Sequence, residues 1–216
     1  MGKTVLIGAS GFIGSAIRKE ALSRGHVVKA VVRNPGRITD HHINLEVIKG
    51  DVLEHEVVKK VCAGADAVIS SYNPGWKNPD IAAETTRGYE SIIRGVREAG
   101  VSRLLVVGGA GSLYVAPGKR LMDTGMIPES FLPAVKALAS VFLEMLPAEK
   151  SIDWVYFSPA GNIMPGERTG NFRIGKDDMI VDDEGKSNIS AEDYAVAMID
   201  ELENATHHRE RFTIGY

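Results

Sequence analysis

The feature that most constrains the fold is an alternation of short β-branched runs with longer amphipathic segments. The runs expected to form strands cover residues 3–8, 26–33, 45–51, 65–71, 102–109 and 152–159. Helices are expected between them, over residues 12–24, 54–63, 80–100 and 129–146. Strands that alternate with helices at this spacing predict a parallel sheet covered by helices on both faces. The sequence therefore predicts an α/β fold with a doubly wound parallel sheet.

The character of the chain changes after Pro159. Residues 161–189 are polar and rich in glycine, and two short extended pieces within them, residues 171–175 and 178–183, are expected to pair as a hairpin. A helix over residues 190–203, which begins at a capping serine, and a short strand over residues 211–215 follow. Since neither a linker nor a repeat interrupts the sequence, we expect one domain over residues 1–216. Residues 161–189 would be its small carboxyl-terminal extension on the substrate side.

Composition excludes several classes of partner. The 216 residues carry a formal net charge of −3, which gives no electrostatic reason to expect binding to nucleic acid or to an anionic membrane surface. The first apolar run is too short for a signal segment or a membrane span. The single cysteine, Cys62, cannot form an internal disulfide, as is usual in a reducing cytosol. We expect a soluble cytoplasmic protein, and its oligomeric state stays open.

The sequence GASGFIG directly follows the first expected strand and opens the first expected helix. Gly8 permits a tight turn, Gly11 a close approach of the backbone to a pyrophosphate, and Gly14 close packing of the helix on the strand. The amino terminus of the helix adds unpaired N–H groups and a partial positive charge. A turn without a ligand is the alternative. We favour a dinucleotide phosphate site in a Rossmann-like fold, formed by Gly8, Ser10, Gly11, Phe12, Ile13 and Gly14.

The end of the second expected strand indicates which dinucleotide binds. A cofactor with a free ribose 2′-hydroxyl usually meets an Asp or Glu at this position, whereas this sequence has Arg33 followed by Asn34. A guanidinium suits a 2′-phosphate, because it can donate paired, charge-assisted hydrogen bonds. A solvated arginine without a ligand is the alternative. We predict NADP as the cofactor, with NAD as the second choice.

Five motifs, taken in order, resemble the atypical short-chain dehydrogenase/reductase superfamily: GASGFIG, VVRNP, GD followed by Val52, GADAVIS and IDWVYFSPA. Within it, the chain is similar to the small NADH-flavin reductases and to NAD-dependent epimerase/dehydratase-like proteins. The tail over residues 165–203 is similar to the flavin-reductase group as well, so that the resemblance extends over nearly the whole chain.

The resemblance implies places for several side chains around the cofactor. Asp51 would lie near the adenine amino group and Val52 against the adenine ring. Ser70 and Ser71 would line the adenosine and its ribose. An alternative for Asp51 is to cap the next helix. The residues implied to approach the nicotinamide are Ser158, Pro159 and Ala160.

The resemblance also implies catalytic residues, with one departure. Typical members of the superfamily use a serine and a Tyr-x-x-x-Lys motif to polarise a carbonyl or to take up an alcohol proton. The serine corresponds to Ser112 and the lysine to Lys136, but Leu132 stands where the tyrosine belongs. Leucine cannot exchange a proton, which argues against alcohol dehydrogenation and epimerisation. Lys136 is expected to border the nicotinamide ribose, or alternatively to be a solvated helix residue.

Hydride transfer to a flavin-like or quinone-like acceptor does not need that tyrosine, since orientation and a dry pocket suffice. We therefore expect an NAD(P)H-dependent reductase of a small-molecule acceptor. The alternatives are an NAD-dependent epimerase or dehydratase and a non-catalytic NADP-binding redox sensor. No metal site is expected, because the histidine pairs lack ligand spacing. Trp76, in a loop that contains proline and glycine, is expected either to cover the ligand or to anchor that loop.

Overall fold

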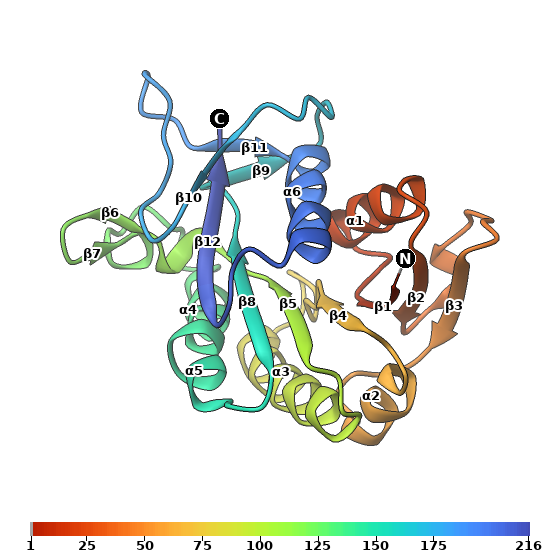
Figure 1. Ribbon diagram of the computed structural model, residues 1–216. Helices are drawn as coiled ribbons and strands as arrows, with labels where there is room; N and C mark the ends of the chain where they lie inside the picture. Colours follow the sequence, from red (N-terminus) through yellow and green to blue (C-terminus); the bar gives the residue numbers. More distant parts are fainter. Residues whose placement is uncertain (1) are drawn as a thin grey trace.

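The computed structural model describes residues 2–216 and is built around an eight-stranded sheet (Figure 1). Its strands are β1 (Lys3–Ile7), β2 (Val27–Val32), β3 (Leu45–Lys49), β4 (Ala67–Ser70), β5 (Arg103–Val107), β8 (Asp153–Ser158), β10 (Arg173–Gly175) and β12 (Glu210–Gly215). The order across the sheet is β10-β12-β8-β5-β4-β1-β2-β3. Neighbouring strands are parallel, except that β10 is antiparallel to β12.

Helices cover both faces of this sheet. α1 (Phe12–Ser23) and α6 (Ala191–Asn204) lie together on one face, while α2 (His55–Cys62), α3 (Ile81–Glu98) and α4 (Leu132–Ser140) lie on the other (Figure 1). α4 continues through a π-helical turn (Val141–Met145) into α5 (Leu146–Ala148).

Burial on both faces explains why the strands were recognisable as continuous apolar runs. In β1, Leu6 belongs to the apolar core beneath α1 and α6, whereas Val5 and Ile7 belong to the core beneath α2 and α3. Consecutive apolar residues in a strand fit only between two such layers. The doubly wound, Rossmann-like α/β fold that the sequence predicts is confirmed.

The prediction of a hairpin within residues 161–189 is wrong. β10 pairs with β12, with Arg173 opposite Gly215, and Asp178 forms an isolated bridge with Tyr114. A separate parallel pair joins β9 (Asn162–Met164) to β11 (Asn188–Ser190). An isolated two-stranded hairpin is marginally stable, whereas the edge of a large sheet offers unpaired backbone groups beside an existing core. The extended pieces therefore pair with distant strands and not with each other.

The carboxylate of Asp193, in the first turn of α6, anchors the 161–189 segment. It is buried and accepts hydrogen bonds from the Thr169 hydroxyl at 2.6 Å, the Gly170 N–H at 2.8 Å and the Tyr216 hydroxyl at 2.8 Å. Burial alone would raise the pKa of Asp193, but these donated hydrogen bonds lower it below its ordinary value. The segment is thus fixed to the helix by a carboxylate whose hydrogen bonds favour the ionised form.

Short elements shape the carboxyl edge of the sheet. They are η1 (Pro35–Arg37) after β2, and η2 (Ala110–Ser112), β6 (Tyr114–Ala116), β7 (Lys119–Arg120) and η3 (Leu121–Asp123) after β5. α4 begins at Leu132 and not at residue 129, because Pro133 occupies its first turn.

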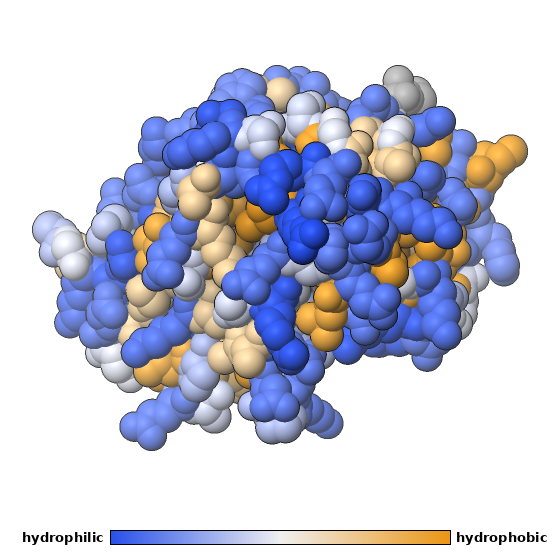
Figure 2. Space-filling model, turned by 90° about the horizontal axis from the view of Figure 1, so that it is seen from below, coloured by the Kyte–Doolittle hydropathy of each residue, from blue (hydrophilic) through white to orange (hydrophobic). Residues whose placement is uncertain are grey.

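The surface carries no large apolar face in the view from below. That face is mainly hydrophilic, with hydrophobic side chains gathered in small patches (Figure 2). Among the helices of residues 2–216, none combines the length and the apolar character needed to cross a bilayer.

Candidate functional site

A cavity of about 870 Å³ lies at the carboxyl edge of the sheet, where the loops after β1, β2, β4, β5 and β8 converge. Its walls include residues 11–13, Arg33 and Arg37, residues 71–76, residues 107–112 and residues 159–161. Parallel strands end at the same edge of a sheet, and open α/β sheets bind their ligands outside these ends. The topology therefore brings the predicted site residues of five separate loops to one place.

The turn after β1 has the backbone geometry that its glycines predict. Gly8 adopts a φ of 75°, and the N–H of Gly11 donates to the carbonyl oxygen of Gly8 at 2.9 Å. A Cβ atom at Gly8 would lie 2.3 Å from the carbonyl oxygen of Ser71, and one at Gly14 would lie 2.2 Å from the carbonyl oxygen of Gly8. Both positions require glycine, because backbone atoms occupy the space of a side chain.

This turn leads into a helix end that can receive an anion. Gly11 is the N-cap of α1, and no side chain within residues 2–216 caps this end. Its first N–H groups and the positive end of the helix dipole therefore remain available to a phosphate. Phe12 and Ile13 line the cavity, whereas Ser10 lies on the same turn outside the lining. The turn fits the pyrophosphate of a dinucleotide.

Two guanidinium groups line the cavity from the chain after β2. Arg33, which the sequence predicts, is exposed, and its Nη2 donates to the carbonyl oxygen of Pro74 at 3.2 Å. Arg37 lies in η1, whose turn is closed by a hydrogen bond from the Gly36 N–H to Oδ1 of Asn34 at 3.1 Å. Sequence analysis missed Arg37, although the turn signal between the two arginines pointed to it. Within residues 2–216, the cavity lining contains no charged residue other than these two arginines.

The residues predicted for the adenosine half divide between the cavity and the core. Ser71 lines the cavity, whereas Ser70 is fully buried at the end of β4. Val52 is buried in the apolar core, and Oδ1 of Asp51 accepts a hydrogen bond at 3.0 Å from the backbone N–H two residues later. Neither Asp51 nor Val52 lines the cavity. The helix-cap alternative for Asp51 is wrong, because Glu54 is the N-cap of α2.

The residues predicted for the nicotinamide half divide in the same way. Ser112, Pro159 and Ala160 line the cavity, and Ser158 is fully buried at the end of β8. Lys136 is exposed on α4 and does not line the cavity, so its placement does not support a role beside the nicotinamide. The register of α4 instead turns four apolar residues toward the cavity: Ala134, Val135, Leu138 and Ala139.

The missing catalytic tyrosine is not replaced by a tyrosine of the cavity wall. Leu132 begins α4 and does not line the cavity. The hydroxyl of Tyr156 accepts a hydrogen bond from the Gly109 N–H at 3.0 Å and donates to the carbonyl oxygen of Leu138 at 3.1 Å, and burial raises its pKa. Burial also raises the pKa of Tyr72 to about 12. Neither phenol suits proton transfer near neutral pH, which is most efficient when the pKa lies near the operating pH.

Ser112 is held by a buried arginine that sequence analysis did not single out. Nη1 of Arg211, on β12, donates to the carbonyl oxygen and to Oγ of Ser112, each at 2.9 Å. Nη2 and Nε of Arg211 donate to Oδ1 of Asp177 at 2.7 and 3.1 Å. The guanidinium carbon lies 4.5 Å from the ring centroid of Phe142. An arginine in a short final strand carries no sequence signal of such burial, since its partners are far away along the chain.

Apolar side chains form the outer wall of the cavity. Met126 reaches it from the chain between η3 and α4, and Met179 from the 161–189 segment. Trp76 reaches it from the loop after β4 and packs edge-to-face on Phe131, with ring centroids 5.5 Å apart. Trp76 is 60% exposed and Met126 74% exposed, and such clustered exposure of large apolar side chains is typical of binding sites. Trp76 therefore anchors its loop and still presents surface to a ligand.

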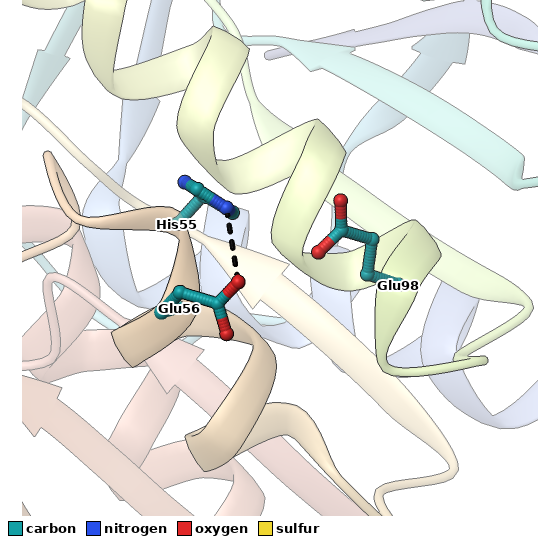
Figure 3. A group of neighbouring side chains, drawn as sticks. All are labelled: His55, Glu56 and Glu98. Atoms are coloured by element: carbon teal, nitrogen blue, oxygen red, sulfur yellow. Dashed lines mark ion pairs between the residues drawn. The ribbon is translucent and has the colours of Figure 1, made fainter.

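One group of metal-ligating residue types lies outside the cavity, between α2 and α3 (Figure 3). It consists of His55, Glu56 and Glu98, with Nε2 of His55 3.2 Å from Oε1 of Glu56. The ammonium group of Lys59 lies 3.6 Å from a carboxylate oxygen of Glu56 and 3.6 Å from one of Glu98. Because this lysine supplies positive charge between the two carboxylates, the group is explained as an ion-pair network that joins the helices.

Comparisons with known proteins agree with this geometry. The model of a family described as NAD(P)H-binding matches residues 8–205. The chain is 40% identical to YwnB of Bacillus subtilis, over 98% of this chain and 97% of YwnB.

Two solved structures are similar over the full length. One, from Bacteroides thetaiotaomicron and provisionally named an epimerase, is 59% identical, with a TM-score of 0.95 and coverage of 100% of this chain and 97% of that chain. The other, from Streptococcus pneumoniae and provisionally named an NADH-flavin reductase, is 36% identical, with a TM-score of 0.85 and coverage of 100% and 99%.

Proposed function

Because the chain belongs to the NAD(P)H-binding family, as its motifs predict, we propose that it is an NADPH-dependent oxidoreductase that reduces a flavin-like or quinone-like acceptor. The observation that carries the proposal is a single cavity that joins a glycine turn and two arginines to an apolar wall. The turn and the arginines suit the charged half of a dinucleotide, and the apolar wall suits a planar acceptor of low charge.

The cofactor half of the proposal rests on backbone and charge. The glycine turn after β1 holds the pyrophosphate against the amino terminus of α1. Arg33 and Arg37 bind the 2′-phosphate through charge-assisted hydrogen bonds, whereas NAD offers only a neutral 2′-hydroxyl at this place. Ser71 borders the ribose of the adenosine, while Pro159 and Ala160 border the nicotinamide. When bound, NADPH supplies a hydride from its nicotinamide ring.

The acceptor half of the proposal rests on the apolar wall and the missing tyrosine. A flavin or quinone accepts a hydride directly when the two rings stack at close range, so the protein has only to orient the acceptor and exclude water. Trp76, Met126 and Met179 supply the surface for this task. Leu132 is compatible with the reaction, because no alcohol proton has to be exchanged. The likeness to the Streptococcus pneumoniae structure supports the same reaction class.

The Bacteroides thetaiotaomicron structure supports a second candidate, an NAD-dependent epimerase. Epimerisation at a carbinol carbon requires a group that takes up and returns an alcohol proton. Leu132 stands at the position of that group, and burial raises the pKa of both tyrosines in the cavity wall, Tyr72 and Tyr156. We therefore favour the reductase.

The test is to follow oxidation of NADPH and NADH by the loss of the reduced-nicotinamide absorbance, with FMN, riboflavin and menadione as acceptors. Calorimetric binding of both cofactors is measured in parallel. Turnover well above the uncatalysed rate with NADPH supports the reductase. Tight NADPH binding without turnover on any acceptor supports a redox sensor. Interconversion of sugar nucleotides by the NAD-loaded protein supports the epimerase.

A further inference from the structure

We propose that Arg211 is a positioning residue that holds the Ser112 hydroxyl as a hydrogen-bond donor toward a carbonyl oxygen of the acceptor. The inference rests on the proposed function and adds how this chain would orient the acceptor. It selects molecules whose carbonyl oxygen gains negative charge on reduction, a class that includes quinones and the isoalloxazine ring of flavins. Arg211 itself touches neither cofactor nor acceptor and acts through Ser112.

The direction of the hydrogen bond leaves the serine proton unused. A guanidinium group has donors only, so Oγ of Ser112 must accept the hydrogen bond from Nη1 of Arg211 at 2.9 Å. The hydroxyl therefore keeps its own proton for donation to another group. Among residues 2–216, the Ser112 hydroxyl accepts this hydrogen bond and donates none. Ser112 lines the cavity, so a bound molecule can supply an acceptor for this proton.

The arginine is itself fixed in place. Asp177 accepts two hydrogen bonds from its fork, and the carbonyl oxygen of Ser112 accepts a third. The face of the guanidinium packs on Phe142, an arrangement that further restrains it. Arg211 is 3% exposed and Ser112 1% exposed. In a site shielded from water, a hydrogen bond donated by a cation to a hydroxyl strengthens the hydrogen bond that this hydroxyl donates in turn. The Ser112 hydroxyl therefore becomes a stronger donor.

The reaction explains why such a donor is useful. The acceptor takes a hydride, which carries two electrons, from the C–H bond of the reduced nicotinamide and leaves the nicotinamide oxidised. A carbonyl oxygen of the acceptor then bears the negative charge until a proton from solvent neutralises it. The Ser112 hydroxyl donates to that oxygen while the charge develops. Removing a preorganised donor of this kind typically lowers kcat by roughly 10²–10³-fold.

The test is a double-mutant cycle on kcat with NADPH and menadione. We expect Ser112→Ala to lower kcat by roughly 10²-fold and Arg211→Gln to lower it by roughly tenfold, with an unchanged dissociation constant for NADPH. Because Arg211 acts through Ser112, the double variant S112A/R211Q should be no slower than S112A alone. Arg211→Lys, which keeps a cationic donor, should lie between wild type and R211Q.

A matched control separates positioning from loss of a buried charge. Arg103, at the amino-terminal end of β5, donates to the buried carboxylate of Glu201 at 2.5 Å and lies outside the cavity lining. Arg103→Gln should lower the melting temperature about as much as R211Q while kcat stays at the wild-type value. Menadione binding to the NADP-loaded protein, followed by Trp76 fluorescence, provides a readout that needs no turnover.

The outcomes separate this inference from the proposed function. If S112A and R211Q lower kcat additively, or if R103Q lowers it as much as R211Q, the positioning role is wrong and the reductase stands. If wild type binds menadione but reduces none of menadione, FMN and riboflavin, the reductase is wrong. In that case the inference stands only if S112A and R211Q weaken menadione binding non-additively. If wild type neither binds nor reduces any carbonyl acceptor, both are wrong.

Discussion

The carbonyl oxygen of Gly8 occupies the space that a side chain at Gly14 would need, 2.2 Å from its Cβ position. Gly14→Ala therefore forces the turn and the first turn of α1 apart. We expect a loss of about 1–3 kcal/mol in the free energy of unfolding, together with strongly weakened NADPH binding. Thermal unfolding and calorimetry measure the two effects.

Gly36→Ala is the matched control for stability. A Cβ atom there would meet Oδ1 of Asn34 at 3.4 Å, an ordinary contact, and the residue has no positive φ. Its melting temperature should stay close to that of wild type. If G14A binds NADPH as wild type does, the close fit between Gly14 and Gly8 is not what makes the phosphate site.

Arg33→Ala and Arg37→Ala should each weaken NADPH binding by more than about tenfold, or about 1.4 kcal/mol, and leave NADH binding unchanged. The reason is that only NADPH carries the 2′-phosphate. Calorimetric titration of both cofactors at fixed salt measures the difference. Arg94→Ala, which removes an exposed arginine paired with Glu98 on α3, is the control. Equal losses for the two cofactors would contradict the 2′-phosphate assignment.

Trp76→Ala should raise the KM for a planar acceptor several-fold and leave the dissociation constant of NADPH unchanged, because an aromatic stacking contact is worth about 0.5–1.5 kcal/mol. Trp76→Phe should retain most of the effect. Acceptor binding should also quench the fluorescence of Trp76, while the buried Trp154 serves as the internal reference. An unchanged KM in W76A would remove this side chain from the acceptor site.

Stability in acid should depend on Asp193. The pKa of this carboxyl is lower in the folded than in the unfolded protein, so the unfolded state binds the proton more readily. Its contribution is therefore present above the unfolded pKa, about 3.9, and is lost as the pH falls below that value. We expect the melting temperature to drop over this range in wild type and to change less in Asp193→Asn.

An exposed aspartate in the same part of the molecule provides the comparison. Asp183 lies in the 161–189 segment and makes no side-chain hydrogen bond within residues 2–216. Asp183→Asn should therefore keep the wild-type acid transition. If it flattens the transition as much as D193N, the effect does not come from the anchored carboxylate.

The sheet was predictable because its strands are buried on both faces. Runs such as residues 3–8 and 102–109 need no knowledge of their neighbours to be read as strands. β10 was harder, because a three-residue strand has too little sequence to choose its partner. Its pairing is decided by the free edge of β12, which exists only once β12 lies beside β8.

The geometry of the candidate site was predictable where the backbone forms it and less so where side chains form it. Gly8 and Gly14 could be identified because their positions admit no other residue. Motif spacing placed Lys136 beside the nicotinamide. Spacing along the sequence does not determine which residues of a helix face the cavity, and Lys136 does not line it. The sequence around Arg211 does not indicate that this arginine is buried. Its burial depends on Asp177 and Phe142, which lie 34 and 69 residues away along the chain.

The place of β12 between β8 and β10 has a consequence for biosynthesis. Residues 210–215 are synthesised after the other strands of this sheet, although their strand lies inside the sheet. A nascent chain that lacks them exposes the edge of β8, and an exposed strand edge invites aggregation. Such a chain already contains the glycine turn, but the Ser112 hydroxyl still lacks its arginine.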